Sequence, residues 1–257
     1  MIDFKKLVQD QKEDIINTRR ALHKIPELGF CEKKTAAFVA DYLEKTGLRV
    51  ETGIAETGVV GLLELGEGGK TLMIRADIDA LPLQEETGLP FASTHEGVMH
   101  ACGHDGNMAM ALGAASILSR NRDRLKGHIK FIFQPAEEGP GGAKPMIEAG
   151  VLENPTVDYA IGCHLHGGTE GTIGVKAGCV LAANDRFDLK IIGKGGHGAT
   201  PHLCIDPIDV GIQVINALQR LASRQIDPLK PVVLTVGRFH AGSAFNVIPG
   251  EAEMAGT

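Results

Sequence analysis

The chain has 257 residues, of which 43% are hydrophobic and 23% charged, an ordinary globular composition that allows one large or two modest domains. Its net charge of −6 is not accompanied by any basic block, and tryptophan is absent, so we expect no nucleic-acid partner. No window approaches the ~18 consecutive apolar residues of a membrane-spanning helix, so we expect no membrane partner either.

The cysteines and the N-terminal residues bear on the location of the protein. Five cysteines without a CxxC pair do not make a disulfide framework in a chain of this length, and the charged N-terminal residues are unlike a signal peptide. These features favour a reducing, cytoplasmic location.

The first part of the chain predicts two helices followed by short strands. Apolar residues recur at helical spacing over residues 4–24, and again over 36–43 before Gly47, which is a typical helix stop. Three β-rich runs follow, at 48–52, 59–65 and 71–76.

Helices and strands then alternate. The pattern predicts a helix over 109–118, a strand over 128–133, a short helix over 143–149 and a strand over 157–163. Such alternation is typical of an α/β sheet with parallel neighbours.

The composition changes after about residue 180, and we place a domain boundary near 178–183. We therefore expect two domains, residues 1–180 and residues 181–257. The elements predicted beyond the boundary are a strand over 186–192, a helix over 207–221, a strand over 232–236 and the start of another over 247–255.

Residues with acid–base and metal-ligand chemistry follow three of the predicted strands. In open α/β sheets, ligands bind outside the carboxyl ends of the strands, so these side chains mark a candidate site. In chain order they are Asp77 and Asp79, Glu137 and Glu138, and His164 and His166. Of the two histidines we favour His164, which is nearer its strand, as a ligand.

The segment 99–108 is the chemically densest part of the chain, with Cys102 and His104 two residues apart. In an extended loop both side chains can point the same way, and thiolate and imidazole are strong ligands for zinc-like metals. A buried cysteine beside a hydrogen-bonded histidine is the alternative interpretation.

Glu137 and Glu138 can divide two roles between them. One carboxylate can coordinate a metal while the other takes a proton from water. A solvated acidic turn is the alternative for this pair.

Six motifs, in this order, resemble those of the metal-dependent N-acyl-amino-acid amidohydrolases, which include hippurate hydrolases, aminoacylase-like carboxypeptidases and plant auxin-conjugate hydrolases. The resemblance runs from about Ile15 to the last residue. The motifs are Asp77-x-Asp79-Ala80-Leu81-Pro82, His100-Ala101-Cys102-Gly103-His104-Asp105, Gln134-Pro135-Ala136-Glu137-Glu138-Gly139, Gly162-Cys163-His164, Gly196-His197-Gly198-Ala199-x-Pro201-His202 and Asn246-Val247-Ile248-Pro249.

The resemblance implies a sheet-and-helix catalytic domain that holds two divalent metal ions, with an inserted α+β lid domain that mediates a homodimer. By motif match, Cys102, His104, Glu138 and His164 are metal ligands and Glu137 is the general base. A thiolate ligand argues for softer ions such as Zn²⁺, and Mn²⁺, Co²⁺ and Ni²⁺ remain compatible with this ligand set.

The same resemblance gives three further residues a role. Asp79 orients a metal ligand, His197 in the lid stabilises the developing oxyanion, and Asn246 holds the carboxylate end of the substrate. Two departures stand out. Many relatives have histidine where Asn107 stands, and relatives continue beyond Thr257 with one more metal-binding histidine, so both domains are expected to be incomplete at the C-terminus.

We therefore expect a metal-dependent enzyme that hydrolyses the amide bond of small N-acyl amino acids such as hippurate. Glu137 takes a proton from water activated by the metal pair, His197 helps to stabilise the tetrahedral oxyanion, and Glu137 returns the proton to the leaving amine. Two alternatives stay open: a truncated, catalytically incomplete relative that only binds metal or dimerises, and a dipeptidase or carboxypeptidase with the same metal pair.

Overall fold

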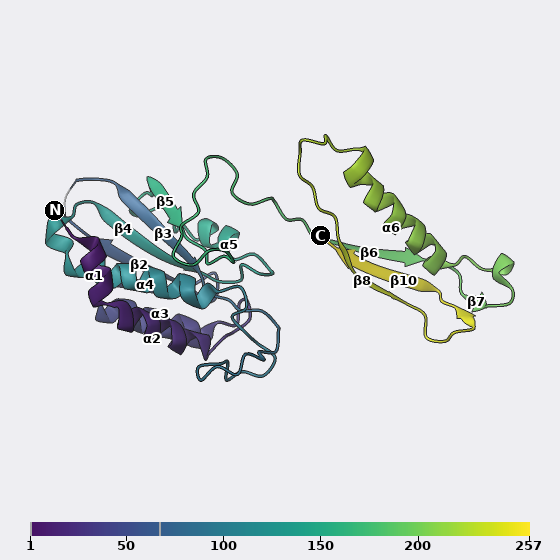
Figure 1. Cartoon of the computed structure of the whole chain (residues 1–257), viewed down its shortest axis with the longest axis horizontal. Helices are drawn as coiled ribbons and strands as arrows, with labels where there is room; N and C mark the ends of the chain where they lie inside the picture. The colour runs from purple at the N-terminus through teal and green to yellow at the C-terminus, as the bar shows by residue number, and fades with distance from the viewer. Residues whose placement is uncertain (1, 67) are drawn as a thin grey trace. The chain divides into compact units, whose positions relative to one another are not determined.

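The computed structural model describes residues 2–66 and 68–257. The chain divides into two compact units, one reaching to Glu170 and one from Gly171 to Thr257 (Figure 1). Both combine helices with a sheet, which confirms the predicted α/β class. The assignment of the two parts to a catalytic and a lid domain stays a prediction.

The first unit is built on a five-stranded sheet in the order β1-β2-β4-β3-β5. β3 runs parallel to β4 and β5, whereas β2 runs antiparallel to β1 and β4, so the sheet is mixed and its parallel part is β4-β3-β5. The strands are β1 (Arg49–Ile54), β2 (Gly58–Glu64), β3 (Thr71–Asp77), β4 (His128–Gln134) and β5 (Tyr159–Gly162).

The core of this unit lies between the sheet and its helices. Alternate residues of a strand face opposite sides, so Phe131 and Phe133 of β4 pack with the long helices while Ile132 packs with Met146 of α5. Figure 1 shows α2, α3 and α4 lying together along the sheet. The helices are α1 (Phe4–Asp10), α2 (Lys12–His23), α3 (Lys33–Lys45), α4 (His104–Arg120), the 3-10 turn η1 (Arg122–Arg124) and α5 (Ala143–Glu148).

The single helix predicted over residues 4–24 is wrong, because the structure has two helices there. The backbone of Gln11 leaves the helical conformation, with φ −105° and ψ 7°, and its side chain is buried. Hydrophobic spacing does not detect this interruption, because Phe4, Val8 and Ile15 still line one apolar groove on both sides of it.

The second unit packs one helix on a three-stranded antiparallel sheet in the order β6-β10-β8. A two-stranded ladder joins β7 to β9, and α6 lies along the larger sheet (Figure 1). The elements are β6 (Phe187–Ile192), β7 (Gly196–His197), the 3-10 turn η2 (Pro201–Leu203), α6 (Pro207–Arg224), β8 (Val236–Ala241), β9 (Val247–Ile248) and β10 (Glu251–Gly256).

Two strand predictions in this unit need correction. The strand expected over 232–236 begins only at Val236, because β10 pairs with β8 from that residue onward and Val233 is 86% exposed. The run over 247–255 is interrupted at Pro249, which has no N–H for a ladder, so it forms β9 and β10 separately.

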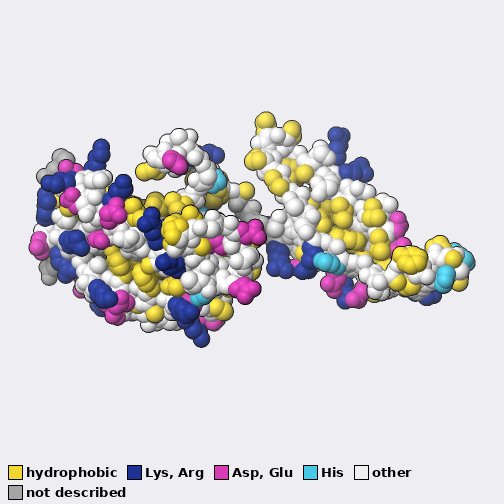
Figure 2. All heavy atoms as spheres, turned by 60° about the horizontal axis from the view of Figure 1, so that its bottom comes forward, with side chains coloured by type: hydrophobic (Ala, Val, Ile, Leu, Met, Phe, Trp, Pro, Cys, Tyr) yellow, Lys and Arg dark blue, Asp and Glu magenta, His cyan; other side chains and the backbone are white. Residues whose placement is uncertain are grey.

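Charged residues of both signs share the surface. Figure 2 shows basic and acidic side chains interspersed over the face that it presents, which agrees with a net charge of −6 without a basic block. No helix within residues 2–66 and 68–257 is both long and apolar enough to cross a membrane.

Phe131→Ala should lower the free energy of unfolding of this chain by about 3–5 kcal/mol, because it removes a large, fully buried side chain from the centre of the sheet. Urea titration followed by circular dichroism measures the loss. Phe4→Ala is the matched control, since Phe4 is 46% exposed. Equal losses for the two variants would contradict the placement of the core.

Candidate metal centre

The parallel strands bring the candidate residues to one edge of the sheet. Asp77 ends β3, Glu137 and Glu138 follow β4, and His164 follows β5. The carboxyl ends of parallel neighbours meet at the same edge, where α4 begins with His104. The residues that follow the predicted strands thus lie at one edge of the sheet, as expected.

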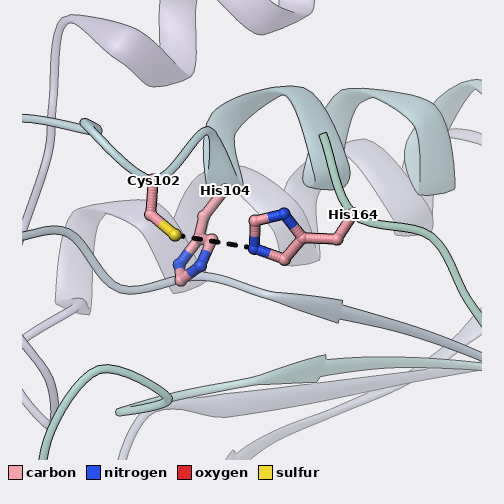
Figure 3. Close-up of side chains that lie close together, drawn as sticks. All are labelled: Cys102, His104 and His164. Atoms are coloured by element: carbon pink, nitrogen blue, oxygen red, sulfur yellow. Dashed lines mark hydrogen bonds between the residues drawn. The ribbon is translucent and has the colours of Figure 1, made fainter. Parts of the chain in front are cut away.

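Cys102, His104 and His164 form the central cluster (Figure 3). One nitrogen or sulfur atom from each lies within 4.8 Å of the others. The Cys102 Sγ is 3.6 Å from His164 Nε2, and the two imidazole rings meet edge to face with centroids 5.4 Å apart. A thiol and two imidazoles at this spacing are a typical zinc-type donor set.

The helix expected over 109–118 already begins at His104, so only Cys102 of the pair lies in the loop before it. His104 is the first residue of α4, and Gly103 caps the helix in the left-handed conformation, with φ 87° and ψ 17°. Glycine adopts this conformation without the steric cost that other residues bear. The turn at Gly103 therefore brings the two side chains together.

His104 is held so that one ring nitrogen faces the carboxylates. It has no exposed surface, and its Nδ1 lies 2.8 Å from the backbone carbonyl oxygen of Asp79. A carbonyl only accepts, so Nδ1 carries a proton, and Nε2 is turned toward Asp77, Glu137 and Glu138 at 3.8, 3.8 and 3.9 Å. Among the residues that the structure describes, Nε2 has no hydrogen-bond partner, which is rare for a buried polar atom.

His164 is oriented in the same way. Its Nδ1 lies 2.6 Å from the backbone carbonyl oxygen of Leu165 and therefore donates to it, which leaves the Nε2 lone pair facing Cys102. Metal-binding histidines commonly donate the other ring N–H to a carbonyl or carboxylate in this manner. In its neutral form each imidazole is thus set in the tautomer that a metal ligand requires.

Asp79 fixes the position of the second acidic residue. Its Oδ2 accepts the backbone N–H of Glu138 at 2.9 Å, and its Oδ1 lies 3.3 Å from His104 Nδ1. Burial opposes ionisation, but the hydrogen bonds from His104 and from the backbone after β4 hold the pKa of Asp79 below its usual value. The ionised Asp79 therefore helps to hold both the His104 ring and the Glu138 backbone in place.

The pocket concentrates negative charge. Burial and the carboxylate of Glu138 raise the pKa of the Cys102 thiol to about 12, and burial, Glu138 and Asp77 raise the pKa of Glu137. Burial lowers the pKa of His104, but the hydrogen bond with Asp79 and the charge of Asp77 outweigh it and raise the value to about 8. A cation bound among these groups would offset the repulsion and favour the thiolate, so the donors fit a divalent metal.

A second possible donor group lies beside the first. Asp77, His104 and Glu137 also have ligand atoms within 4.8 Å of one another. Asp77 is almost fully buried and pairs with Arg75 at 2.7 Å. The sequence placed Asp77 at the strand end but gave it no role, and either Glu137 or Glu138 is near enough to His104 to share a metal with it.

His197 and Asn246 belong to the second unit and are not part of this cluster. They are neighbours there, because Gly198 donates its N–H to the Asn246 carbonyl at 2.9 Å and His197 pairs with Val247 across β7 and β9. Their roles in oxyanion stabilisation and substrate binding stay predictions. His166 is exposed and joins neither donor group.

The sequence did not point to Glu32, whose carboxylate is hydrogen-bonded to the loop that carries Glu137 and Glu138. This carboxylate is fully buried; it accepts the Ala136 N–H at 2.9 Å and the Thr57 hydroxyl at 2.6 Å. Ala136 has a φ of 51°, a strained value for a residue other than glycine, and it directly precedes Glu137. A charged residue beside a helix start resembles a surface residue in the sequence, so no pattern identified it.

Comparison with known proteins agrees with this geometry. A model of peptidase family M20/M25/M40 matches residues 73–255. The chain is 51% identical over 257 residues to an N-acyl-L-amino acid amidohydrolase of Geobacillus stearothermophilus, covering 99% of this chain and 69% of that protein. It is 46% identical over 254 residues to thermostable carboxypeptidase 1 of Saccharolobus solfataricus, covering 97% of this chain and 64% of that protein.

A crystal structure of similar fold comes from Bacillus subtilis and is described as a dinuclear metal binding peptidase of the M20 family. It superposes with a TM-score of 0.75 at 42% identity, covering 96% of this chain and 64% of that one. The chain thus spans about two thirds of the length of these proteins. The matches confirm the family resemblance predicted from the six motifs.

Cys102→Ala should lower the Zn²⁺ content of the chain, because it removes the sulfur donor from the central cluster. Metal analysis after dialysis against Zn²⁺ and removal of free metal measures the occupancy. Cys179→Ala is the control, since Cys179 is exposed in the second unit. Unchanged occupancy in the Cys102 variant would contradict its assignment as a ligand.

Proposed function

The chain belongs to peptidase family M20/M25/M40, and from this premise we propose that it is a metal-dependent hydrolase of the amide bond in N-acyl amino acids. The observation that carries the proposal is the pair of imidazoles, His104 and His164, whose Nδ1 atoms are bonded to backbone carbonyls while their Nε2 atoms face Cys102 and the carboxylates. The N-acyl-L-amino acid amidohydrolase at 51% identity supports the substrate class.

In this proposal Cys102, His104, Glu138 and His164 hold two divalent ions, which can be Zn²⁺, Mn²⁺, Co²⁺ or Ni²⁺. The dinuclear relative of known structure supports the number of ions. When bound, the metal pair supplies Lewis acidity, which lowers the pKa of a water molecule in the pocket and polarises the scissile carbonyl.

Glu137 is the proposed general base. Its side chain is 41% exposed, so it can reach both solvent and substrate, and its raised pKa suits a group that takes a proton and later returns it. The water oxygen bonds to the acyl carbon, Glu137 takes the proton, and the C–N bond breaks as Glu137 passes that proton to the leaving nitrogen. The products are a carboxylic acid and an amino acid.

His197 and Asn246 complete the proposed machinery from the second unit. The Nδ1 of His197 accepts the Ala199 N–H at 3.1 Å, so a neutral His197 carries its proton on Nε2. That N–H suits stabilisation of the oxyanion, and the Asn246 amide suits the substrate carboxylate. We further propose a homodimer formed through this unit and a cytoplasmic location, which the five free cysteines support.

A peptidase that acts on dipeptides is the second candidate, and the carboxypeptidase at 46% identity favours it. The same metal pair and general base serve either amide, so a substrate comparison separates the two candidates. A chain that binds metal without turnover is the third outcome to test.

We expect chelation to abolish hydrolysis of N-acyl amino acids and added Zn²⁺, Mn²⁺ or Co²⁺ to restore it, because the chemistry needs the Lewis acid. The assay measures release of the free amino acid from a panel that includes hippurate and matched dipeptides. Preference for dipeptides would favour the peptidase. A folded, metal-loaded chain without turnover on any of them would contradict the proposed activity.

Glu137→Gln should keep the metal content and lower the rate by ~10²-fold or more, the scale of general-base catalysis. Glu138→Gln is the companion variant, and it should lower the metal content instead. Steady-state rates and metal analysis on the same samples separate the two effects. A Glu137 variant with near-normal turnover would contradict its assignment as the base.

A further inference from the structure

We propose that Asn107 is a positioning residue that anchors the segment carrying His164 to α4 and β3. The inference rests on the proposed function, in which His164 binds a metal. It concerns a residue that has no role in the proposed function.

The Asn107 amide connects two other parts of the first unit. Its Nδ2 donates to the Asp77 Oδ1 at the end of β3 at 2.8 Å, and its Oδ1 accepts the Leu165 N–H at 3.0 Å. The side chain is only 2% exposed. A carboxylate only accepts and a backbone N–H only donates, so the two partners fix which way the amide faces.

The Leu165 backbone links the Asn107 side chain to the His164 ring through two hydrogen bonds. Its N–H is held by Asn107, and its carbonyl accepts the Nδ1–H of His164 at 2.6 Å. The orientation of the His164 ring toward Cys102 therefore depends on where the Leu165 backbone lies.

Packing against two glycines supports the same position. A Cβ on Gly106 would overlap the end of the Leu165 side chain, and one on Gly103 would lie 3.3 Å from the Leu165 Cβ. The side chain of Leu165 thus occupies space at the start of α4 that only glycines leave open.

The segment that carries His164 is not held in place by burial. Residues 159–170 are all exposed, and β5 is an edge strand of the sheet. Asp77, by contrast, is 1% exposed and is held on its other oxygen by Arg75 at 2.7 Å. Asn107 therefore ties an exposed segment to a rigid, buried carboxylate, which preorganises His164 before any metal binds.

Asn107→Ala tests the inference without using turnover. We expect Zn²⁺ affinity to fall by about 10- to 100-fold, the usual effect of losing a group that orients a ligand, and the Leu165 amide to exchange its hydrogen faster. Competition with a chromophoric chelator gives the affinity, and hydrogen exchange of the metal-free chain gives the protection. Ser116→Ala is the matched control, since Ser116 is buried on the same helix away from the cluster.

A second pair of variants serves if the Asn107 variant does not fold. Leu165→Pro removes the backbone N–H that donates to Asn107 without changing Asn107 itself. Leu165→Ala keeps this N–H and removes most of the side chain. The proline variant should bind Zn²⁺ more weakly than the alanine variant. Equal affinities in this pair, or wild-type affinity and exchange in Asn107→Ala, would overturn the inference.

The proposed function and this inference fail in different ways. If the wild-type chain binds Zn²⁺ but does not hydrolyse any substrate, the affinity test of Asn107 is unaffected. If the wild-type chain binds no Zn²⁺, the proposed metal site fails, and His164 then has no metal for Asn107 to position, which overturns the inference as well.

Discussion

The buried carboxylate of Asp79 joins three of the segments that form the site. It follows β3, it faces the His104 ring at the start of α4, and its Oδ2 accepts the Glu138 N–H from the loop after β4. A buried carboxylate is costly unless it is hydrogen-bonded. Each of these contacts therefore stabilises the ionised Asp79, and together they fix sheet, helix and loop in one arrangement.

That arrangement gathers more negative charge than its own cations balance. Arg75 pairs with Asp77, and in the ion pairs of the described residues Glu137 and Glu138 share the single imidazole of His104, which Asp77 and Asp79 also face. Burial and, after it, the neighbouring carboxylates raise the pKa of both Cys102 and Glu137. Holding these like charges together lowers the free energy of unfolding. A divalent ion that binds only the folded chain would raise it again.

The sequence predicted the elements and the central residues well, because both depend on local signals. Strand ends predicted one location for Asp77, Glu137, Glu138 and His164, and the dense segment 99–108 identified Cys102 and His104. The residues that support the candidate ligands could not be predicted from the sequence, because their partners are distant in the chain. Asn107 and Leu165 are 58 residues apart, and Glu32 and Ala136 are 104 apart. The left-handed turn at Gly103 was missed for a different reason: spacing alone does not distinguish a helix start from an extended loop.

The orientation of the His197 ring, whose role is a proposal, is set by residues close to it in the second unit. Two residues beyond His197, the Ala199 N–H bonds its Nδ1, and the neighbouring Gly198 is tied to the Asn246 carbonyl. The ring orientation and the proton on Nε2 therefore need no contact from the first unit. His104 and His164 follow the same rule, since each donates Nδ1–H to a backbone carbonyl. In each of the three histidines a backbone group is hydrogen-bonded to Nδ1, so Nε2 is the nitrogen that can act on a metal ion or a substrate.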